Sequence, residues 1–225
     1  MNLNLSPSLM CMNLKTFADD IKFLDNKIDS YHIDIMDGHY VKNITLSSWF
    51  ISQIRKISKT KISTHLMMTN PEDFIIDCIN AGSDTICLHT DIIEKQAFRL
   101  INIVKDSGKE FGIVLNPATI IEVIKPYIHL LDKITVMTVD PGFAGQKFIS
   151  EAVGKIKELS NLKKENGYKY KIEVDGSCNK NTWKTLYDAG TEIYIVGSSG
   201  LFGLDSNVEK AWDKMQNEIN IAIGN

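Results

Sequence analysis

The sequence carries almost no excess of charge, because 25 lysines and arginines stand against 28 aspartates and glutamates, a formal net charge of −3. So balanced a chain lacks the basic surface that would attract nucleic acid or an anionic membrane. It also lacks any apolar run near the roughly 18 residues that a membrane span needs. Its first residues do not show the basic and apolar segments of a secretory signal. We expect no nucleic-acid partner, no membrane association and a cytoplasmic protein.

Cysteine and proline are also sparse. The four cysteines, which show no paired motif, are Cys11, Cys78, Cys87 and Cys178. Their wide spacing indicates reduced thiols. No linker, low-complexity run or change in composition divides the 225 residues, of which 44% are hydrophobic and 24% charged. Since this composition allows a substantial core, we expect residues 1–225 to form one domain.

What the sequence does have is a regular alternation of strand-like and helix-like segments. We expect strands at residues 3–8, 31–36, 61–66, 85–89, 111–116, 133–139, 170–175 and 192–197. We expect helices at residues 14–27, 49–57, 94–106, 120–127, 151–164, 181–188 and 207–223, and one that opens at Asn70-Pro71-Glu72. About eight strand–helix units predict an α/β fold, a single (β/α)8 TIM barrel. A doubly wound open sheet is the alternative, because periodicity cannot show whether a sheet closes.

Polar residues follow several of these strands. His32 and Asp34 are two apart, so in a strand their side chains share one face. His65 and Asp175 each close a further short apolar run. Four such donors at strand ends predict one divalent cation at the mouth of a parallel sheet, with zinc, manganese, cobalt, magnesium and iron(II) all possible. The alternative is that these residues are helix caps and surface loops.

Three methionines come at or near the same strand ends: Met36, Met67 and Met137. Methionine is most often a core filler. Its other role here would be a polarizable lid that keeps water from the site.

Glycine-bearing turns leave the last three strands at residues 140–146, 175–177 and 197–200. Glycine lets backbone amides approach an anion closely, and in many barrels the loops after strands seven and eight bind phosphate. Turns need glycine in any case. Their convergence on one mouth nevertheless favours a phosphate site.

These residues together resemble the ribulose-phosphate 3-epimerase family. The motifs that carry the resemblance are Ser6-Pro7-Ser8, His32-x-Asp34-x-Met36-Asp37-Gly38, His65-Leu66-Met67, Val139-Asp140-Pro141-Gly142-Phe143 with Gly145-Gln146, and Val174-Asp175-Gly176. The resemblance implies that Asp34 and Asp175 are the acid/base pair, and that they ligate the metal with His32 and His65. It implies substrate contacts at Ser6, His65, Asp175, Gly142, Phe143, Ala144, Gly145, Gly176, Ser177, Gly197, Ser198 and Ser199, and a homo-oligomer, either a dimer or a hexamer.

Within the family, the segments around Thr45, Met137 and Asp175 look most like members that act on D-allulose 6-phosphate. Enzymes of the family that act on pentoses usually carry glycine where Ala144 and Ser177 stand. We therefore expect a metal-dependent 3-epimerase that interconverts D-allulose 6-phosphate and D-fructose 6-phosphate by two-aspartate proton transfer through an enediolate. The alternative is epimerisation of ribulose 5-phosphate and xylulose 5-phosphate.

The chain also departs from the family pattern. Lys42 stands where proline is usual, and Asp91 replaces a common glutamate after His89. We expect these changes to affect the detail of the loops and to leave the chemistry intact. Two further readings are a metal-dependent aldolase or decarboxylase on the same kind of barrel, and a non-catalytic sugar-phosphate sensor.

Overall fold

The computed structural model, described here for residues 3–224, is built on one sheet of nine strands. Their order in the sheet is β1-β9-β8-β7-β6-β5-β4-β2-β3, and all neighbouring pairs are parallel except β2 and β3. The strands are β1 (Asn4–Pro7), β2 (Ser30–Asp37), β3 (Ile44–Thr45), β4 (Lys61–Met67), β5 (Thr85–His89), β6 (Glu110–Leu115), β7 (Lys133–Met137), β8 (Lys171–Asp175) and β9 (Ile193–Val196).

The sheet closes on itself between β1 and β2. Ser8 forms a parallel bridge with His32, just beyond the end of β1. At the other end, the backbone N–H of Asp29 donates to the carbonyl of Leu5, and the Leu5 N–H donates to the Asp29 side chain at 3.1 Å. The eight parallel strands thus form a closed TIM barrel, as the sequence predicts, and the open-sheet alternative is wrong.

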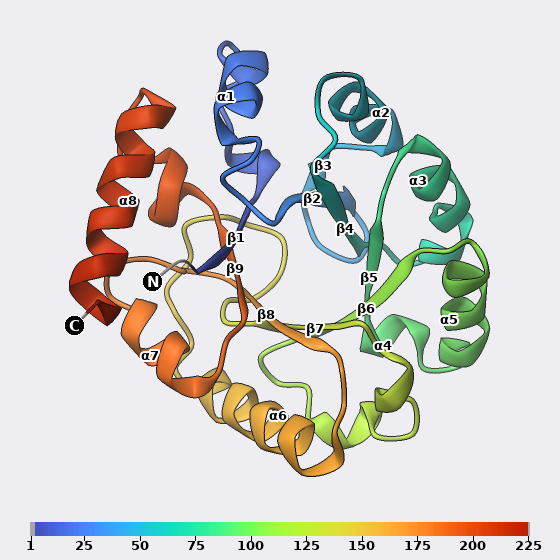
Figure 1. Cartoon of the computed structure of the whole chain (residues 1–225). Coiled ribbons are helices and arrows are strands. Elements are labelled where there is room, and N and C mark those ends of the chain that lie inside the picture. The colour runs from blue at the N-terminus through green and yellow to red at the C-terminus, as the bar shows by residue number, and fades with distance from the viewer. Residues whose placement is uncertain (1–2, 225) are drawn as a thin grey trace.

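The helices lie around the outside of the barrel (Figure 1). They are α1 (Phe17–Leu24), α2 (Ser48–Ile57), α3 (Ile75–Ala81), α4 (Thr90–Ile93), α5 (Ala97–Asp106), α6 (Ala152–Asn166), α7 (Trp183–Ala189) and α8 (Val208–Ile223). The longer helices bury a stripe of apolar residues, as α5 does with Leu100, Ile101 and Val104. Burial of these stripes against the strands stabilises helices that would be too short to persist alone.

The structure differs from the sequence prediction in several elements. The segment that opens at Asn70 begins as a 3₁₀ helix (Pro71–Asp73), and α3 starts only at Ile75. Residues 120–127 form no α-helix but a 3₁₀ helix at Ile121–Ile124, because Pro126 lacks an N–H and its ring would clash with the preceding turn. The helix expected at 94–106 begins only at Ala97, as α5, and a separate short helix, α4 (Thr90–Ile93), precedes it. The two-residue strand β3, which pairs antiparallel with the end of β2, was not expected, since so short a segment has no periodicity to read.

A buried ion pair between the neighbouring strands β7 and β8 lies in the interior of the barrel. The Lys133 ammonium from β7 lies 2.8 Å from the Glu173 carboxylate on β8 and donates to Ser63 of β4 at 2.9 Å. Lys133 is 5% exposed and Glu173 not at all. Room for this side chain depends on Gly112, because a Cβ there would lie 2.6 Å from the Cys87 sulfur and 3.3 Å from the Lys133 Cβ.

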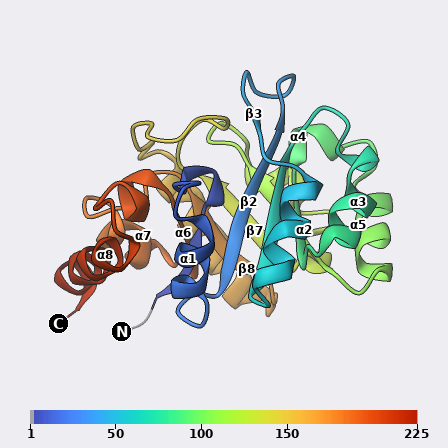
Figure 2. The same cartoon turned by 90° about the horizontal axis from the view of Figure 1, so that it is seen from above.

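The carboxyl ends of the parallel strands meet at one end of the barrel. Figure 2 shows the hairpin that carries β3 projecting beyond this end, with the loop that follows β7 (yellow) beside it. Asp175, the last residue of β8, lies two positions beyond Glu173 and therefore faces the same interior. Within residues 3–224, no helix combines the length and the apolar character needed to cross a membrane.

Candidate active site

Two histidines and two aspartates converge at the carboxyl ends of β2, β4 and β8. His32 Nε2 lies 3.1 Å from Asp34 Oδ1, which lies 3.3 Å from His65 Nδ1. Asp175 Oδ2 lies 3.6 Å from His65 Nδ1 and 3.8 Å from His32 Nε2. We call these four atoms the donor ring. All four lie within 4.8 Å of one another.

Strand register explains why these side chains meet. His65 on β4 is directly opposite Asp34 on β2, and both residues point into the barrel. His32 is two residues before Asp34, so it shares that face. Asp175 reaches the same point from β8, on the other side of β1 and β9 in the sheet order. The barrel therefore assembles the ring from strands far apart in the sequence.

The donor ring fits a divalent cation. Ligand distances of 2.0–2.2 Å place neighbouring ligands of a tetrahedral ion about 3.3–3.6 Å apart, and the four distances around the ring run from 3.1 to 3.8 Å. His65 Nδ1 is buried, and no protein atom among residues 3–224 makes a hydrogen bond to it. Nitrogen and carboxylate oxygen donors in this number suit zinc, manganese, cobalt and iron(II).

The electrostatics of the ring favour positive charge at its centre. Burial by itself lowers the pKa of His65, but the nearby carboxylates of Asp175 and Asp34 outweigh burial and raise the pKa to about 9. Burial raises the pKa of Asp34, yet His32 and His65 reverse this and hold it below its ordinary value. A ring that attracts protons this strongly also attracts a metal cation.

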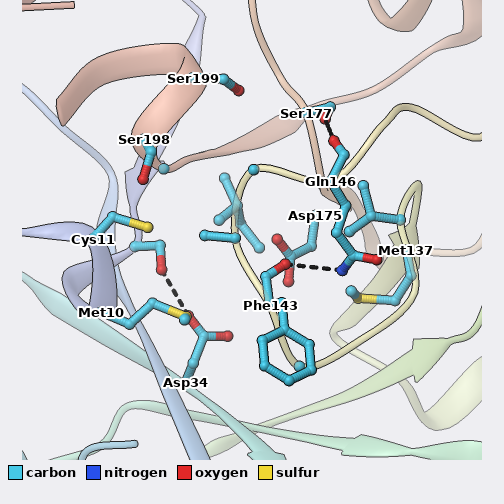
Figure 3. A pocket seen from close by; sticks show the side chains of 18 of the residues that line it. Met10, Cys11, Asp34, Met137, Phe143, Gln146, Asp175, Ser177, Ser198 and Ser199 are labelled. Atoms are coloured by element: carbon cyan, nitrogen blue, oxygen red, sulfur yellow. Dashed lines mark hydrogen bonds between the residues drawn. The ribbon is translucent and has the colours of Figure 1, made fainter. Parts of the chain in front are cut away.

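A pocket opens beside the ring, and it has two chemically different ends. Figure 3 shows Asp34 at one end and Ser177, Ser198 and Ser199 at the other, with Asp175 between them. Most residues that the resemblance assigns to substrate line this pocket: Gly142, Phe143, Ala144, Gly145, Asp175, Gly176, Ser177, Gly197, Ser198 and Ser199. One end therefore offers carboxylates, and the other offers hydroxyls and glycine backbone.

The loops at the hydroxyl end are joined to one another. Gly176 has φ +121°, and a Cβ there would lie 2.8 Å from Val139 Cγ2, so only glycine fits without strain. Thr138 Oγ1 donates to the Gly176 carbonyl at 2.5 Å, and Ser177 Oγ donates to the Gln146 carbonyl at 2.5 Å. These bonds connect the loop after β7 to the loop after β8 and hold both at the pocket.

Met36, Met67 and Met137 all line the pocket, together with Met10. Each of the first three is at most 3% exposed. Met36 and Met67 also pack with Val41, which lies in the hairpin before β3. They thus fill the core and face the pocket at once.

Two assignments from the sequence fall elsewhere. Ser6 is fully buried and shares a hydrogen bond of 2.9 Å with Ser30, so it does not reach the pocket. Ser8, two residues further along the same face, lines the pocket and donates to Asp34 Oδ2 at 2.7 Å. The alternation of side chains along the strand predicts which face Ser6 and Ser8 share. It does not predict where β1 ends, and therefore not which of the two serines reaches the pocket. His65 is also fully buried and does not line the pocket.

Other residues at the site were not assigned from the sequence. Besides Ser8, the pocket is lined by Met10, Cys11, Val139, Asp140, Gln146, Cys178 and Ile195. Most of these are ordinary apolar or loop residues that carry no chemical signature of their own. Gln146 is informative in retrospect, because its side chain donates to the Asp140 and Phe143 carbonyls and thereby shapes the loop after β7.

The chain is similar to known proteins over nearly its whole length. Residues 4–202 match the sequence profile of the Ribulose-phosphate 3 epimerase family. A ribulose-phosphate 3-epimerase of Bacillus subtilis is 35% identical over 199 residues, which cover 88% of this chain and 91% of that protein. One from Escherichia coli K12 is 30% identical over 217 residues, 96% of this chain and 95% of that protein.

Solved structures show the same fold. A mutant tryptophan synthase alpha-subunit from Pyrococcus furiosus superposes with a TM-score of 0.70 at 14% identity, over 100% of this chain and 98% of that one. An identity this low supports the barrel fold and carries no information on chemistry. The sequence matches do carry information on chemistry, because they cover most of the chain at higher identity. The chain therefore belongs to the ribulose-phosphate 3-epimerase family, which makes it an isomerase.

Proposed function

We propose that the chain is a metal-dependent 3-epimerase of a ketose phosphate. One observation carries the proposal: Asp34 and Asp175 each place one oxygen in the donor ring and also line a pocket whose far end consists of glycine and serine loops. Inversion beside a ketone needs two carboxyl groups on opposite sides of a planar intermediate. The far end would bind the phosphate through backbone N–H groups and hydroxyls.

His32, Asp34, His65 and Asp175 would hold the cation, which when bound supplies the positive charge that stabilises an enediolate. Asp34 Oδ2 accepts a hydrogen bond from Ser8, which orients that carboxylate toward the pocket. The Asp175 side chain is 18% exposed, against 5% for Asp34. One aspartate would remove the C3 proton, and the other would deliver a proton to the opposite face.

Ribulose 5-phosphate is the substrate that the comparisons support best, because the relatives described above are named for ribulose phosphate. D-Allulose 6-phosphate, the substrate favoured by the local motifs, is the second candidate. Its support is that Ala144 and Ser177 stand where family members acting on pentoses usually have glycine. Ser177 keeps the positive φ of +50° that glycine would adopt. The two sugars differ by one hydroxymethylene, so discrimination of about 1–3 kcal/mol is expected.

The test is turnover of both sugar phosphates in heavy water. Deuterium should appear at C3 of the recovered ketose, and comparison of kcat/KM should favour ribulose 5-phosphate. A higher kcat/KM for allulose 6-phosphate would select the second candidate. Exchange confined to C1 would instead indicate an aldose–ketose isomerase, and products of carbon–carbon cleavage would indicate an aldolase. Either result would refute the proposed function.

We further propose that residues 1–225 act as one domain, in the cytoplasm and as a homo-oligomer, with Met36, Met67 and Met137 as the cover of the site. Support for an oligomer comes from large apolar side chains on the surface, among them Ile44 at 76% and Trp49 at 69% exposure. Light scattering on the purified protein should return the mass of a dimer or hexamer, and a monomer would contradict this part.

A further inference from the structure

His65 touches a second buried histidine on the side away from the pocket. His65 Nε2 lies 2.8 Å from His89 Nε2. The ring centroids are 4.8 Å apart and the rings are tilted by only 29°. Because the two nitrogens are much closer than the centroids, the rings meet edge to edge and share one hydrogen bond. One Nε2 must carry the proton, and the other must accept it.

The chain of contacts continues from His89 to the surface. His89 Nδ1 and Asn116 Oδ1 are both buried, and among residues 3–224 neither atom makes a hydrogen bond. The Asn116 side chain lies close enough to the His89 ring to influence its pKa. Asn116 Nδ2 donates to the Tyr40 hydroxyl at 2.9 Å. The Tyr40 hydroxyl in turn donates to the Asp91 carboxylate at 3.2 Å, and the Tyr40 ring packs on His89 with centroids 4.6 Å apart.

The direction of every hydrogen bond follows from Asp91. A carboxylate only accepts, so the Tyr40 hydroxyl must donate to it and accept from the Asn116 amide nitrogen. Since the Asn116 nitrogen donates to Tyr40, Asn116 can offer His89 only its oxygen, and an acceptor there favours a proton on His89 Nδ1. In neutral His89 this leaves Nε2 as an acceptor, so His65 carries its proton on Nε2. His65 Nδ1 is left with a lone pair that points into the donor ring.

We infer that His89, Asn116, Tyr40 and Asp91 are a positioning chain that fixes the tautomer and ring orientation of His65 as a cation ligand. The inference rests on the cation site of the proposed function. Hydrogen bonds to the far nitrogen of a ligating histidine commonly fix the tautomer in this way, and their loss weakens metal binding about 10–100-fold. None of these four residues touches the substrate pocket. Asp91, whose change from glutamate looks incidental in the sequence, is the outer end of the chain.

The first test reads the tautomers of the zinc-loaded wild-type protein. The sequence has only 5 histidines, so long-range ¹⁵N–¹H spectra of histidine-labelled protein can be assigned one residue at a time. We expect His65 to be protonated at Nε2 and His89 at Nδ1. A proton on His89 Nε2 would overturn the inference, and so would a wild-type protein that binds no zinc.

The second test measures zinc affinity by competition with a chelator. His89→Phe keeps a ring but removes both nitrogens, so zinc affinity should fall about 10–100-fold. His89→Gln fits the cavity less well but restores an acceptor for His65, so it should bind zinc more tightly than His89→Phe. The matched control is His129→Phe, at an exposed position, which should bind zinc like wild type.

A role in packing alone predicts the reverse order for the two His89 variants, and that order would overturn the inference. Unchanged zinc affinity in His89→Phe would overturn it as well. Failure of the proposed function gives a different pattern. A protein that binds zinc with the expected tautomers but does not epimerise sugar phosphates would support the positioning chain and refute only the reaction.

Discussion

Replacement of Lys133 by methionine should destabilise the barrel strongly, because it leaves the Glu173 carboxylate buried without its partner. In the folded protein that carboxylate accepts from Lys133 Nζ and from Thr135 Oγ1, each at 2.8 Å, and it is fully buried. Removal of one member of such a pair costs about 3–5 kcal/mol. Urea denaturation of metal-free Lys133→Met should therefore show this loss in the free energy of unfolding, with an unchanged m-value.

The double variant Lys133→Met/Glu173→Gln is the control. Glutamine removes the buried charge and keeps an acceptor for Thr135, so at least half of the lost free energy should return. A loss below about 1 kcal/mol in the single variant would refute the reasoning, and so would a double variant less stable than the single one.

The pH dependence gives an independent check. Burial raises the pKa of Glu173, but Lys133 and His32 reverse this and lower it in the native protein. The wild-type pair thus contributes stability at neutral pH, and this contribution is lost as the pH falls through the folded pKa. Without Lys133, burial would raise the pKa of Glu173, so protonation relieves the penalty. The stability difference between wild type and Lys133→Met should shrink from pH 7 to pH 5, and a difference that widens would contradict the account.

Three further outcomes are expected. Asp34→Asn and Asp175→Asn should each lower kcat by about 10²–10⁴-fold with phosphosugar binding partly retained, and either variant within tenfold of wild type would lose its acid/base role. A chelator should lower the melting temperature, and zinc at 100 times its Kd should restore about 2.7 kcal/mol; no shift would argue against the cation site. Gly112→Ala should cost about 1–3 kcal/mol, since its Cβ would lie 2.6 Å from the Cys87 sulfur. Its control Gly154→Ala, in α6 with nothing within 4 Å, should stabilise by about 0.5–1 kcal/mol.

Much of the barrel could be predicted because its signals are local. The strand β2 can be predicted because Tyr31, Ile33 and Ile35 alternate with His32 and Asp34, and this alternation places His32 and Asp34 on one face. Since the carboxyl ends of parallel strands meet, His65 and Asp175 could be added to the same site before any contact was known. The structure brings all four together.

What escaped prediction depends on contacts distant in sequence or on exact strand ends. Tyr40 and Asp91 are 51 residues apart, and nothing in either segment shows that they meet. Ser6 and Ser8 share a face, so only the length of β1 decides which one reaches the pocket. The ion pair between Lys133 and Glu173 could not be predicted either, because a lysine near the start of a strand is usually solvated.

The junction between β1 and β2 has a consequence for how this enzyme would respond to its ligands. Besides the bonds between Leu5 and Asp29 and between Ser6 and Ser30, the junction rests on the bridge from Ser8 to His32 and on the hydrogen bond from the Ser8 hydroxyl to Asp34. This junction, which few bonds hold together, therefore lies partly at the end of the barrel that carries the donor ring. Transient separation of β1 and β2 would pull Ser8 away from Asp34. A ligand bound at this end of the barrel should therefore stabilise the pairing of the two strands. Slower amide exchange along β1 in the presence of the ligand would show this effect.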